Sequence, residues 1–322
     1  MIGVRTPFRI SLSGGSTDIE SFYKDNGGKV ISSSINKFMY HFIHKFSKDM
    51  IQVKYSKTEL VKDVEDIEHP IVRETGKLYD LTGLDINSIA DVPKGSGLGS
   101  SSAYTVGLIN GLSNLNNEEL TKNDIANLAC DIEINKLSEP IGKQDQFATA
   151  LGGFNILEFK KDGSVEVNPL DLEQEGIDHI NSSLTLVRYG ESRDASKILS
   201  SQKTNMEEGT NIEYGKAILD LVNPMIKSVK SFDIKSIGEL LTENWNLKSK
   251  LSNEVSSKEL QVFINELLKE KDIYGCKLLG AGKSGYILVA GEKKKIKNLR
   301  SLDLLEFNFE NSGTSIILKD NN

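Results

Sequence analysis

A stretch rich in glycine and serine stands directly before a run of apolar residues, and this junction constrains the fold more than any other feature. KGSGLGSSSA, residues 94–103, holds three glycines and four serines. From Ala103 to Leu112, apolar residues recur every three positions, a spacing typical of one buried helix face. A glycine-rich segment that opens a helix lets backbone N–H groups converge on an anion, beside the positive end of the helix dipole. The junction therefore predicts a phosphate-binding loop.

The serine hydroxyls of this loop add to the same prediction. They can bind phosphate oxygens or complete the shell of a Mg²⁺ ion, which usually combines one or two protein oxygens with waters and substrate phosphates. A flexible Gly-Ser linker is the alternative, but linkers do not normally run straight into an amphipathic helix, as this stretch does after Pro93. We therefore expect the loop to hold the phosphates of a nucleoside triphosphate.

A second phosphate-loop signature, GAGKS at 280–284, resembles the end of a Walker A loop but does not complete it. The full pattern needs a glycine at position 277, where this chain has Lys277. It also needs a helix after the lysine and serine, whereas SGYILVAG has the pattern of a strand. We expect a tight turn near a ligand here, because a Walker A ATPase would require a helix after Ser284.

Length and charge narrow the class of protein. The chain has 322 residues, of which 38% are hydrophobic and 26% charged, so it can bury a substantial core in about two domains. The 46 acidic residues outnumber the 39 basic ones and give a formal charge of -7. Such a surface is unsuited to neutralising a phosphate backbone. We therefore expect a small molecule as the main partner rather than nucleic acid.

The cysteines and the first residues indicate the compartment. Cys130 and Cys276 are far apart and have no metal-ligand neighbours, so neither a disulfide framework nor a zinc site is predicted. MIGVRTPFRI lacks the apolar core and small-residue cleavage site of a secretory leader, and no run of about 18 apolar residues follows. We expect a cytoplasmic protein that is neither exported nor inserted in a membrane.

The apolar periodicity predicts strands and helices in alternation after a sheet-rich beginning. A polar, turn-rich stretch at 160–183 is the expected junction between two domains. Strands are predicted at 8–12, 29–34, 38–46, 154–159, 184–189 and 286–290. Helices are predicted at 103–112, 124–137, in a short piece ending at Leu151, at 212–230 with a kink at Pro224, and at 234–251 and 258–269.

Glu133 and Asp145 are candidates for chemistry in the middle of the chain. Glu133 continues a helical stripe of small residues, Ala126, Ala129 and Cys130, so a buried carboxylate would need a cation or a metal as its partner. An exposed Glu133 paired with Lys136 fits the spacing equally well. Asp145 lies in EPIGKQDQFATALGGF, at the start of a predicted short helix. As an alternative to a catalytic role, an acid at this position simply interacts favourably with the helix dipole.

The N-terminal segment TPFRISLSGGSTD supplies two further candidates. Arg9 lies inside a predicted strand, and Asp18 follows a glycine turn. As alternatives, Arg9 is a surface strand residue and Asp18 is the cap of a helix at 19–23.

Taken together, three motifs resemble those of the GHMP kinases and occur in the family's order along almost the whole chain: TPFRISLSGGSTD, PKGSGLGSSSA and KLLGAGKSGYILV. Within the family, the resemblance is strongest to the kinases of D-glycero-D-manno-heptose 7-phosphate, through RISLSGGSTD, EPIGKQDQFATALGGFN and YGESRDASKIL. The sequence differs from the family motifs at two places, and these differences affect the prediction of the sugar more than the prediction of kinase chemistry. Ser16 stands where a third glycine is typical, and Lys283 with Ser284 stands where that branch usually has glycines.

The resemblance implies an α+β fold with two domains and a binding cleft between them. Residues 1–180 would form a ribosomal S5-like, ATP-binding domain, and residues 181–322 a ferredoxin-like domain. ATP phosphates would be held by Lys94, Gly95, Ser96, Gly97, Leu98, Gly99, Ser100 and Ser101. Ser101 and Glu133 would hold Mg²⁺, with Ser102 as a rival to Ser101.

The resemblance also implies how the sugar would lie. Asp145 would face the accepting hydroxyl with Arg9 near it, while Asp18, Gly14 and Gly15 would line the sugar site. Residues 280–285 would support the site from the second domain as a turn. Arg193 is a candidate for the distal phosphate of the substrate, because a guanidinium can bind phosphate bidentately, and a surface arginine is the alternative.

The implied activity is ATP-dependent phosphorylation of the anomeric C1 hydroxyl of a heptose 7-phosphate, with a small-molecule sugar phosphate as substrate and a homodimer as one assembly to test. The alternatives are a GHMP kinase for another sugar or sugar phosphate, and a non-catalytic sugar or nucleotide sensor on the same scaffold. The presence of both Glu133 and Asp145 argues against a sensor, because a mere binding protein would not need the pair.

Overall fold

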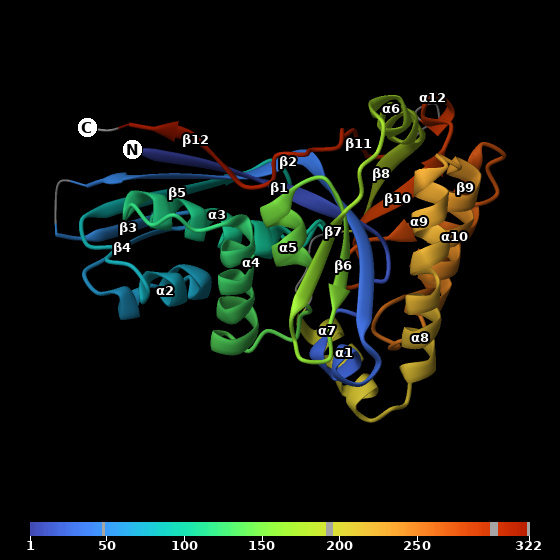
Figure 1. The fold of residues 1–322 in the computed structure, drawn as a ribbon, viewed down its shortest axis with the longest axis horizontal. Helices are drawn as coiled ribbons and strands as arrows, with labels where there is room; N and C mark the ends of the chain where they lie inside the picture. The colour runs from blue at the N-terminus through green and yellow to red at the C-terminus, as the bar shows by residue number, and fades with distance from the viewer. Residues whose placement is uncertain (47–48, 191–195, 297–301, 321–322) are drawn as a thin grey trace.

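The computed structural model describes residues 1–46, 49–190, 196–296 and 302–320, which form two β-sheets covered by helices (Figure 1). The first sheet has eight strands in the order β12-β1-β2-β5-β3-β4, with β6 paired to β2 and β7 to β6. Its strands are β1 (Ile2–Ser13), β2 (Gly28–Lys45), β3 (Ile51–Lys54), β4 (Thr58–Val61), β5 (Leu84–Ala90), β6 (Phe154–Phe159), β7 (Val165–Pro169) and β12 (Ser315–Lys319).

The second sheet has four strands in the order β11-β8-β10-β9, all antiparallel. They are β8 (Leu184–Tyr189), β9 (Ile273–Leu278), β10 (Gly285–Gly291) and β11 (Leu304–Leu305). Two sheets, each with its own helices, agree with the α+β class that the sequence predicts.

The helices of the first half of the chain are α1 (Glu20–Asn26), η1 (Val64–Asp66), α2 (Pro70–Gly76), α3 (Ser100–Leu115), α4 (Lys122–Cys130), the π-helical segment η2 (Asp131–Lys136), α5 (Gln144–Leu151) and α6 (Gln174–Ser183). Those of the second half are α7 (Ser196–Glu207), α8 (Ile212–Asp220), α9 (Val222–Lys230), α10 (Ile234–Lys248), α11 (Lys258–Leu267) and α12 (Lys293–Ile296). No helix of the described residues is long and apolar enough to cross a membrane.

The central strand pair β1 and β2 carries the residues on which the site is built. β1 is buried along most of its length, because β2 and β12 flank it and helices α3 and α5 pack against it. The two strands predicted at 29–34 and 38–46 are one long strand, whose pairing with β1 shifts at Pro7 and Phe8. Proline has no N–H to give to a ladder, so an irregular register is an expected place for it.

The predicted helix at 124–137 is interrupted by a wider turn. A capping box between Thr121 and Asp124 begins α4, as helix-start chemistry requires. After Cys130 the backbone continues as the π-helical segment η2, and such single-turn segments are frequent at functional sites. Glu133 lies in this segment. The helix predicted at 212–230 is divided between α8 and α9, with the break at Leu221, three residues before Pro224.

The end of the described chain returns to the first sheet. After β11, Phe309 bridges to Ile35, and β12 pairs with β1 so that Ile2 lies opposite Lys319. The two ends therefore lie side by side at one edge of the molecule (Figure 1). The division into domains at 1–180 and 181–322 stays a proposal, and β12, which it assigns to the second domain, is a strand of the first sheet.

Helix α10 packs on β9 through a backbone contact between two glycines. A Cβ atom added at Gly275 would lie 1.8 Å from the carbonyl oxygen of Gly238 and 2.7 Å from the Thr242 hydroxyl. No real side chain fits at these distances, so both positions need glycine for space. The same helix carries Trp245, which is fully buried.

We expect Gly275→Ala to lower the free energy of unfolding by about 1–3 kcal/mol or more, the usual cost of an overpacked core. The added methyl would push α10 away from β9 because backbone, rather than a flexible side chain, stands in its way. Chemical denaturation followed by circular dichroism measures the change. An unaltered unfolding midpoint and slope would show that the close contact does not hold α10 on the sheet.

Candidate active site

The predicted phosphate loop lies between the end of β5 and the start of α3, and its glycines adopt the left-handed backbone. Gly95, Gly97 and Gly99 have φ angles of +75°, +78° and +77°. Other residues rarely adopt this conformation, which explains the alternation of glycine with serine and leucine. Gly99 is the residue from which α3 begins, so the loop leads into a helix N-terminus as expected.

The side chains of the loop divide between core and solvent. Leu98 is fully buried and Ser96 is nearly so, whereas Lys94 and Ser101 are exposed. The Leu98 carbonyl oxygen accepts a hydrogen bond from the Arg9 N–H at 3.0 Å, which ties the loop to β1. Leu98 thus anchors the loop to the core and to β1.

The turn between β9 and β10 packs directly against the loop. The Ser96 carbonyl oxygen accepts from the Tyr286 N–H at 3.0 Å, and a Cβ at Gly97 would lie 2.7 Å from the Leu279 carbonyl oxygen. A Cβ at Gly280 would in turn lie 2.5 Å from the Gly97 Cα. The Walker A alternative for 280–284 is wrong, because Ser284 is followed by strand β10 and not by a helix.

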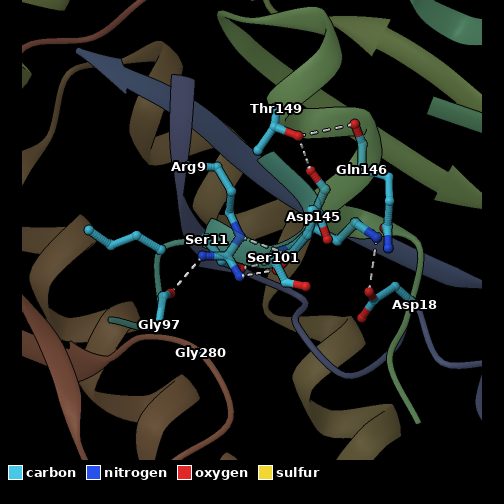
Figure 2. A network of polar contacts seen from close by, with 12 residues as sticks. Arg9, Ser11, Asp18, Gly97, Ser101, Asp145, Gln146, Thr149 and Gly280 are labelled. Atoms are coloured by element: carbon cyan, nitrogen blue, oxygen red, sulfur yellow. Dashed lines mark hydrogen bonds and ion pairs between the residues drawn. The ribbon is translucent and has the colours of Figure 1, made fainter. Parts of the chain in front are cut away.

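Arg9 and Asp145 form a partly buried, bidentate ion pair at the centre of the site (Figure 2). Arg9 Nε donates to Asp145 Oδ1 at 2.8 Å, and Nη2 donates to Oδ2 at 2.6 Å. Arg9 Nη1 donates to the Gly97 carbonyl oxygen at 2.7 Å. The Arg9 side chain is 5% exposed and that of Asp145 is 28% exposed. Arg9 is therefore no surface strand residue, and the Asp145 carboxylate remains reachable from solvent.

Asp18 caps a helix, but not the one beside it in sequence. Helix α1 begins after Ile19 without a side-chain cap, so the interpretation of Asp18 as its cap is wrong. Asp18 Oδ2 instead accepts from the Gln144 N–H, at the start of α5, and Oδ1 accepts from the Ser16 N–H, both at 3.0 Å. Burial raises the pKa of Asp18, while the hydrogen bond from Gln144 opposes the rise.

The two glycines predicted to line the sugar site differ in position. Gly15 borders a cavity of about 100 Å³ between β1, α5 and α10. Gly14 lies beneath the turn, where a Cβ would meet the Lys29 carbonyl oxygen at 2.0 Å, so it shapes the turn rather than the cavity wall. Arg193 lies outside the described residues.

Two lysines that sequence reasoning did not select also border this cavity. Lys248 ends α10 and Lys277 lies in β9, and both are buried. Lys277 begins the motif KLLGAGKSGYILV, which could have drawn attention to it, whereas nothing in the sequence around Lys248 marks that residue. The larger cavity of about 430 Å³ between α1, β6 and α9 is a weaker candidate, because its residues Lys29 and Lys160 are paired with Glu158.

Glu133 is buried, with 1% of its surface exposed, so the exposed pairing with Lys136 is wrong. Its carboxylate accepts from Ser101 Oγ at 2.9 Å, Ser102 Oγ at 2.8 Å and Gln146 Nε2 at 2.7 Å. Burial raises the pKa of Glu133 to about 7, and the hydroxyl of Ser102 opposes that rise. The partners of the carboxylate are thus two hydroxyls and an amide rather than a cation.

The donor set around Glu133 fits Mg²⁺. One carboxylate beside a serine hydroxyl supplies the hard oxygen ligands that this ion prefers, with phosphates and waters completing its shell. Among the described ranges, no group of three or more His, Cys, Asp or Glu residues forms a metal cage made by protein alone. Ser101 is exposed and Ser102 is 2% exposed, which favours Ser101 as the hydroxyl that an ion could reach.

Comparison with known families agrees with this geometry. A family model described as the GHMP kinases N terminal domain matches residues 59–153, and one described as the GHMP kinases C terminal matches residues 225–301. Together the two matches take in more than half of the chain, and they contain the loop, Glu133, Asp145 and the turn at 280–285. The chain belongs to the GHMP kinases.

Known members of the family are similar along almost the whole length. The D-glycero-alpha-D-manno-heptose 7-phosphate kinase of Campylobacter jejuni is 29% identical over 313 residues, which cover 92% of this chain and 91% of that protein. The galactokinase of Pyrococcus furiosus is 27% identical over 95% of this chain and 93% of its own. A structure titled D-glycero-D-manno-heptose 1-phosphate kinase, from Bacteriodes thetaiotaomicron, covers 99% of this GHMP kinase and 100% of its own chain with a TM-score of 0.80 and 22% identity. This GHMP kinase is therefore an ATP-dependent sugar kinase in fold and class.

We expect Gly97→Val to weaken ATP binding by at least about ten-fold in a protein that still folds. Valine would be strained at a φ of +78°, and its side chain would meet the Leu279 backbone at a point where loop and turn touch. Isothermal titration with ATP measures the loss.

Gly209→Val is the matched control for this substitution. Gly209 also has a positive φ, +71°, but nothing lies within 4 Å of an added Cβ and it is far from the loop in sequence. Equal ATP affinity in the Gly97 and Gly209 variants would contradict the role of the loop.

Proposed function

We propose that this GHMP kinase transfers the γ-phosphoryl group of ATP to the anomeric C1 hydroxyl of D-glycero-α-D-manno-heptose 7-phosphate, which gives the 1,7-bisphosphate. The observation that carries the proposal is the Arg9–Asp145 pair, which joins the phosphate loop to the cavity beside it. The similarity to the Campylobacter jejuni enzyme, which extends along 92% of this chain, supports the choice of sugar.

Asp145 is the proposed proton acceptor. The sugar oxygen forms a bond to the γ-phosphorus, the bond between that phosphorus and the bridging oxygen of ADP breaks, and the hydroxyl proton passes to Asp145. An ordinary aspartate has a pKa of about 3.9, so it cannot deprotonate a sugar hydroxyl in advance. In a loose transition state the hydroxyl becomes acidic late, and a nearby carboxylate can then accept its proton.

Arg9 has two roles in this proposal. Its two donors to Asp145 fix the direction of the carboxylate, and its third contact, to the Gly97 carbonyl oxygen, fixes the loop relative to that carboxylate. Its positive charge also lies where phosphoryl oxygens would approach, and positioning with charge neutralisation is most of what phosphoryl transfer requires.

Ser101 and Glu133 are the residues that would hold Mg²⁺, as proposed from the oxygen donors described above. A bound Mg²⁺ supplies neutralisation of phosphate charge. The loop residues from Lys94 to Ser101 would surround the ATP phosphates through their backbone N–H groups, with Asp18 and Gly15 at the sugar. A homodimer is also proposed, and a measurement of molecular mass in solution would test it.

A GHMP kinase for another sugar phosphate is the alternative, and one observation favours it. Ser16, which borders the cavity, stands where a third glycine is typical, and Lys283 with Ser284, in the turn after β9, stands where the heptose branch usually has glycines. A panel of sugars and sugar phosphates, assayed for ADP release with ATP and Mg²⁺, tests the choice, and phosphorus NMR of the product locates the new phosphate. Turnover of another sugar without turnover of heptose 7-phosphate would overturn the proposed substrate and leave the kinase class intact.

We expect Asp145→Asn to lower kcat by roughly 10²–10⁴-fold, the usual effect of losing a general base. Asparagine keeps one acceptor oxygen for Arg9 while its amide NH2 replaces the other, and the Gly97 carbonyl oxygen still accepts from Arg9 Nη1. Single-turnover kinetics measure the chemical step, and titrations with ATP and sugar phosphate confirm binding. A rate within a few-fold of the parent would reduce Asp145 to a residue that favours the start of α5.

We expect Glu133→Gln to raise the Mg²⁺ concentration needed for half-maximal activity by about ten-fold or more while the fold stays intact. The amide has the shape of the carboxylate but not its charge, which is what attracts the ion. A magnesium titration at saturating ATP measures the change. Asp131→Asn is the control, because Asp131 lies in the same segment and accepts from Asn135 at 2.8 Å. Identical titrations for both variants would leave Glu133 with a structural role alone.

A further inference from the structure

Two buried lysines border the cavity next to Asp145, and the proposed reaction gives neither of them a role. Lys248 is 6% exposed and Lys277 is 1% exposed. They come from α10 and β9, on the side of the second sheet, and face the same cavity as Arg9 and Asp145. Lysines are almost never fully buried unless they are paired, so two in one cavity need a physical reason.

The contacts of these lysines are with neutral backbone oxygens. Lys277 Nζ donates to the carbonyl oxygens of Ser11 at 3.1 Å and Leu12 at 3.3 Å. Lys248 Nζ donates to the carbonyl oxygen of Gly280. Within the described parts of the chain, neither ammonium forms an ion pair with a carboxylate. Each ammonium has three donors, so part of their capacity is left for a ligand.

The cavity brings three basic side chains, Arg9, Lys248 and Lys277, together with two carboxylates, Asp18 and Asp145. Burial lowers the pKa of Lys277 well below its ordinary value, and the neighbouring charges of Lys248 and Arg9 lower it further. Burial lowers the pKa of Lys248 to about 8; the charge of Arg9 adds to that effect, and the carboxylates of Asp18 and Asp145 oppose it. Of the carboxylates that face the cavity, Asp145 is already paired with Arg9, and Asp18 already accepts from the N–H groups of Ser16 and Gln144.

Holding three backbone carbonyls does not require charge, since a neutral donor could do the same without the cost of burying an ammonium. Two ammonium groups next to the Arg9 guanidinium repel one another, and an anion that binds between them would lower the free energy of that arrangement. A phosphate monoester brings two negative charges near neutral pH and several acceptor oxygens, and lysine binds such groups as a compact point charge.

We propose that Lys248 and Lys277 bind the phosphate that the sugar substrate already carries, so that the cavity selects a sugar monophosphate over the neutral sugar. This inference rests on the proposed function, because it identifies the part of the substrate that the same site would recognise. It places the distal phosphate on the second-sheet side of the cavity, where α10 and β9 supply the two lysines.

The test compares one sugar with and without its phosphate. KM and kcat are measured with D-glycero-D-manno-heptose 7-phosphate and with the unphosphorylated heptose, and titration calorimetry measures binding of both. The variants are Lys248→Met and Lys277→Met, which keep length and remove charge, and Lys248→Arg, which keeps the charge. Lys235→Met is the matched control, because Lys235 lies on the same helix α10 with a side chain 74% exposed.

We expect Lys248→Met to raise KM and Kd for the 7-phosphate by about 10–100-fold, while the values for the neutral heptose change by less than about three-fold. Lys248→Arg should recover part of the loss, and Lys235→Met should behave as the parent. If Lys277→Met does not fold, the Lys248 variants decide the question alone, since their side chain lies at a helix end.

Equal losses with the two sugars would overturn the inference, because they would show that the lysines act on the turn or on phosphoryl transfer. An unchanged KM for the 7-phosphate would overturn it as well. If the parent binds the 7-phosphate in a Lys248-dependent way but transfers no phosphoryl group to it, the proposed reaction fails while the phosphate site stands. If the parent turns over the 7-phosphate and Lys248→Met binds it normally, the phosphate site fails while the proposed reaction stands.

Discussion

The contacts of one guanidinium hold together the parts of this site. Arg9 is fixed by its position in the middle of β1, a strand flanked by β2 and β12, so its direction is set by the core. From there it reaches the Asp145 carboxylate and the Gly97 carbonyl oxygen at once. A planar group with several fixed donors can orient two partners in this way, which a lysine could not. The start of α5 and the phosphate loop are thereby placed by the same side chain.

The glycines of the loop serve a second purpose that anion binding alone does not explain. Gly97 and Gly280 meet backbone to backbone, so the loop of the first sheet and the turn of the second approach more closely than any side chain would allow. The Ser96 carbonyl oxygen also accepts from the Tyr286 N–H. Glycine is thus needed on both sides of the junction, and the loop cannot shift without moving β10. The loop of the first sheet and the turn before β10 are therefore packed directly on each other.

Sequence reasoning predicted what depends on local pattern and missed what depends on the tertiary fold. The loop-to-helix junction and the strand after the turn follow from glycine spacing and apolar periodicity, and both are present. Spacing could not decide whether Glu133 is buried, because the wider π-helical turn that carries it has no sequence signal. The alternative to a sugar-site role for Asp18 was a cap on the nearest helix, but its carboxylate accepts from the N–H at the start of α5, far along the chain. Lys248 likewise has no sequence signal, because only the tertiary fold places it at the cavity.

Ser16 and Lys283 stand at positions where the resemblance predicts glycine. Both residues have a positive φ, which glycine adopts more readily than other residues. Ser16 has a φ of +79° and Lys283 a φ of +55°, which cost roughly 1–2 kcal/mol each for a residue with a side chain. Both keep the turn and gain a contact that glycine lacks: Ser16 Oγ donates to Gln202 Oε1 at 3.1 Å, and Lys283 pairs with Glu254. Gln202 Nε2 also donates to the Ala281 carbonyl oxygen at 3.1 Å. The two side chains therefore keep the left-handed backbone of their turns and add contacts beside the cavity, where Ser16 and Ala281 form part of its lining.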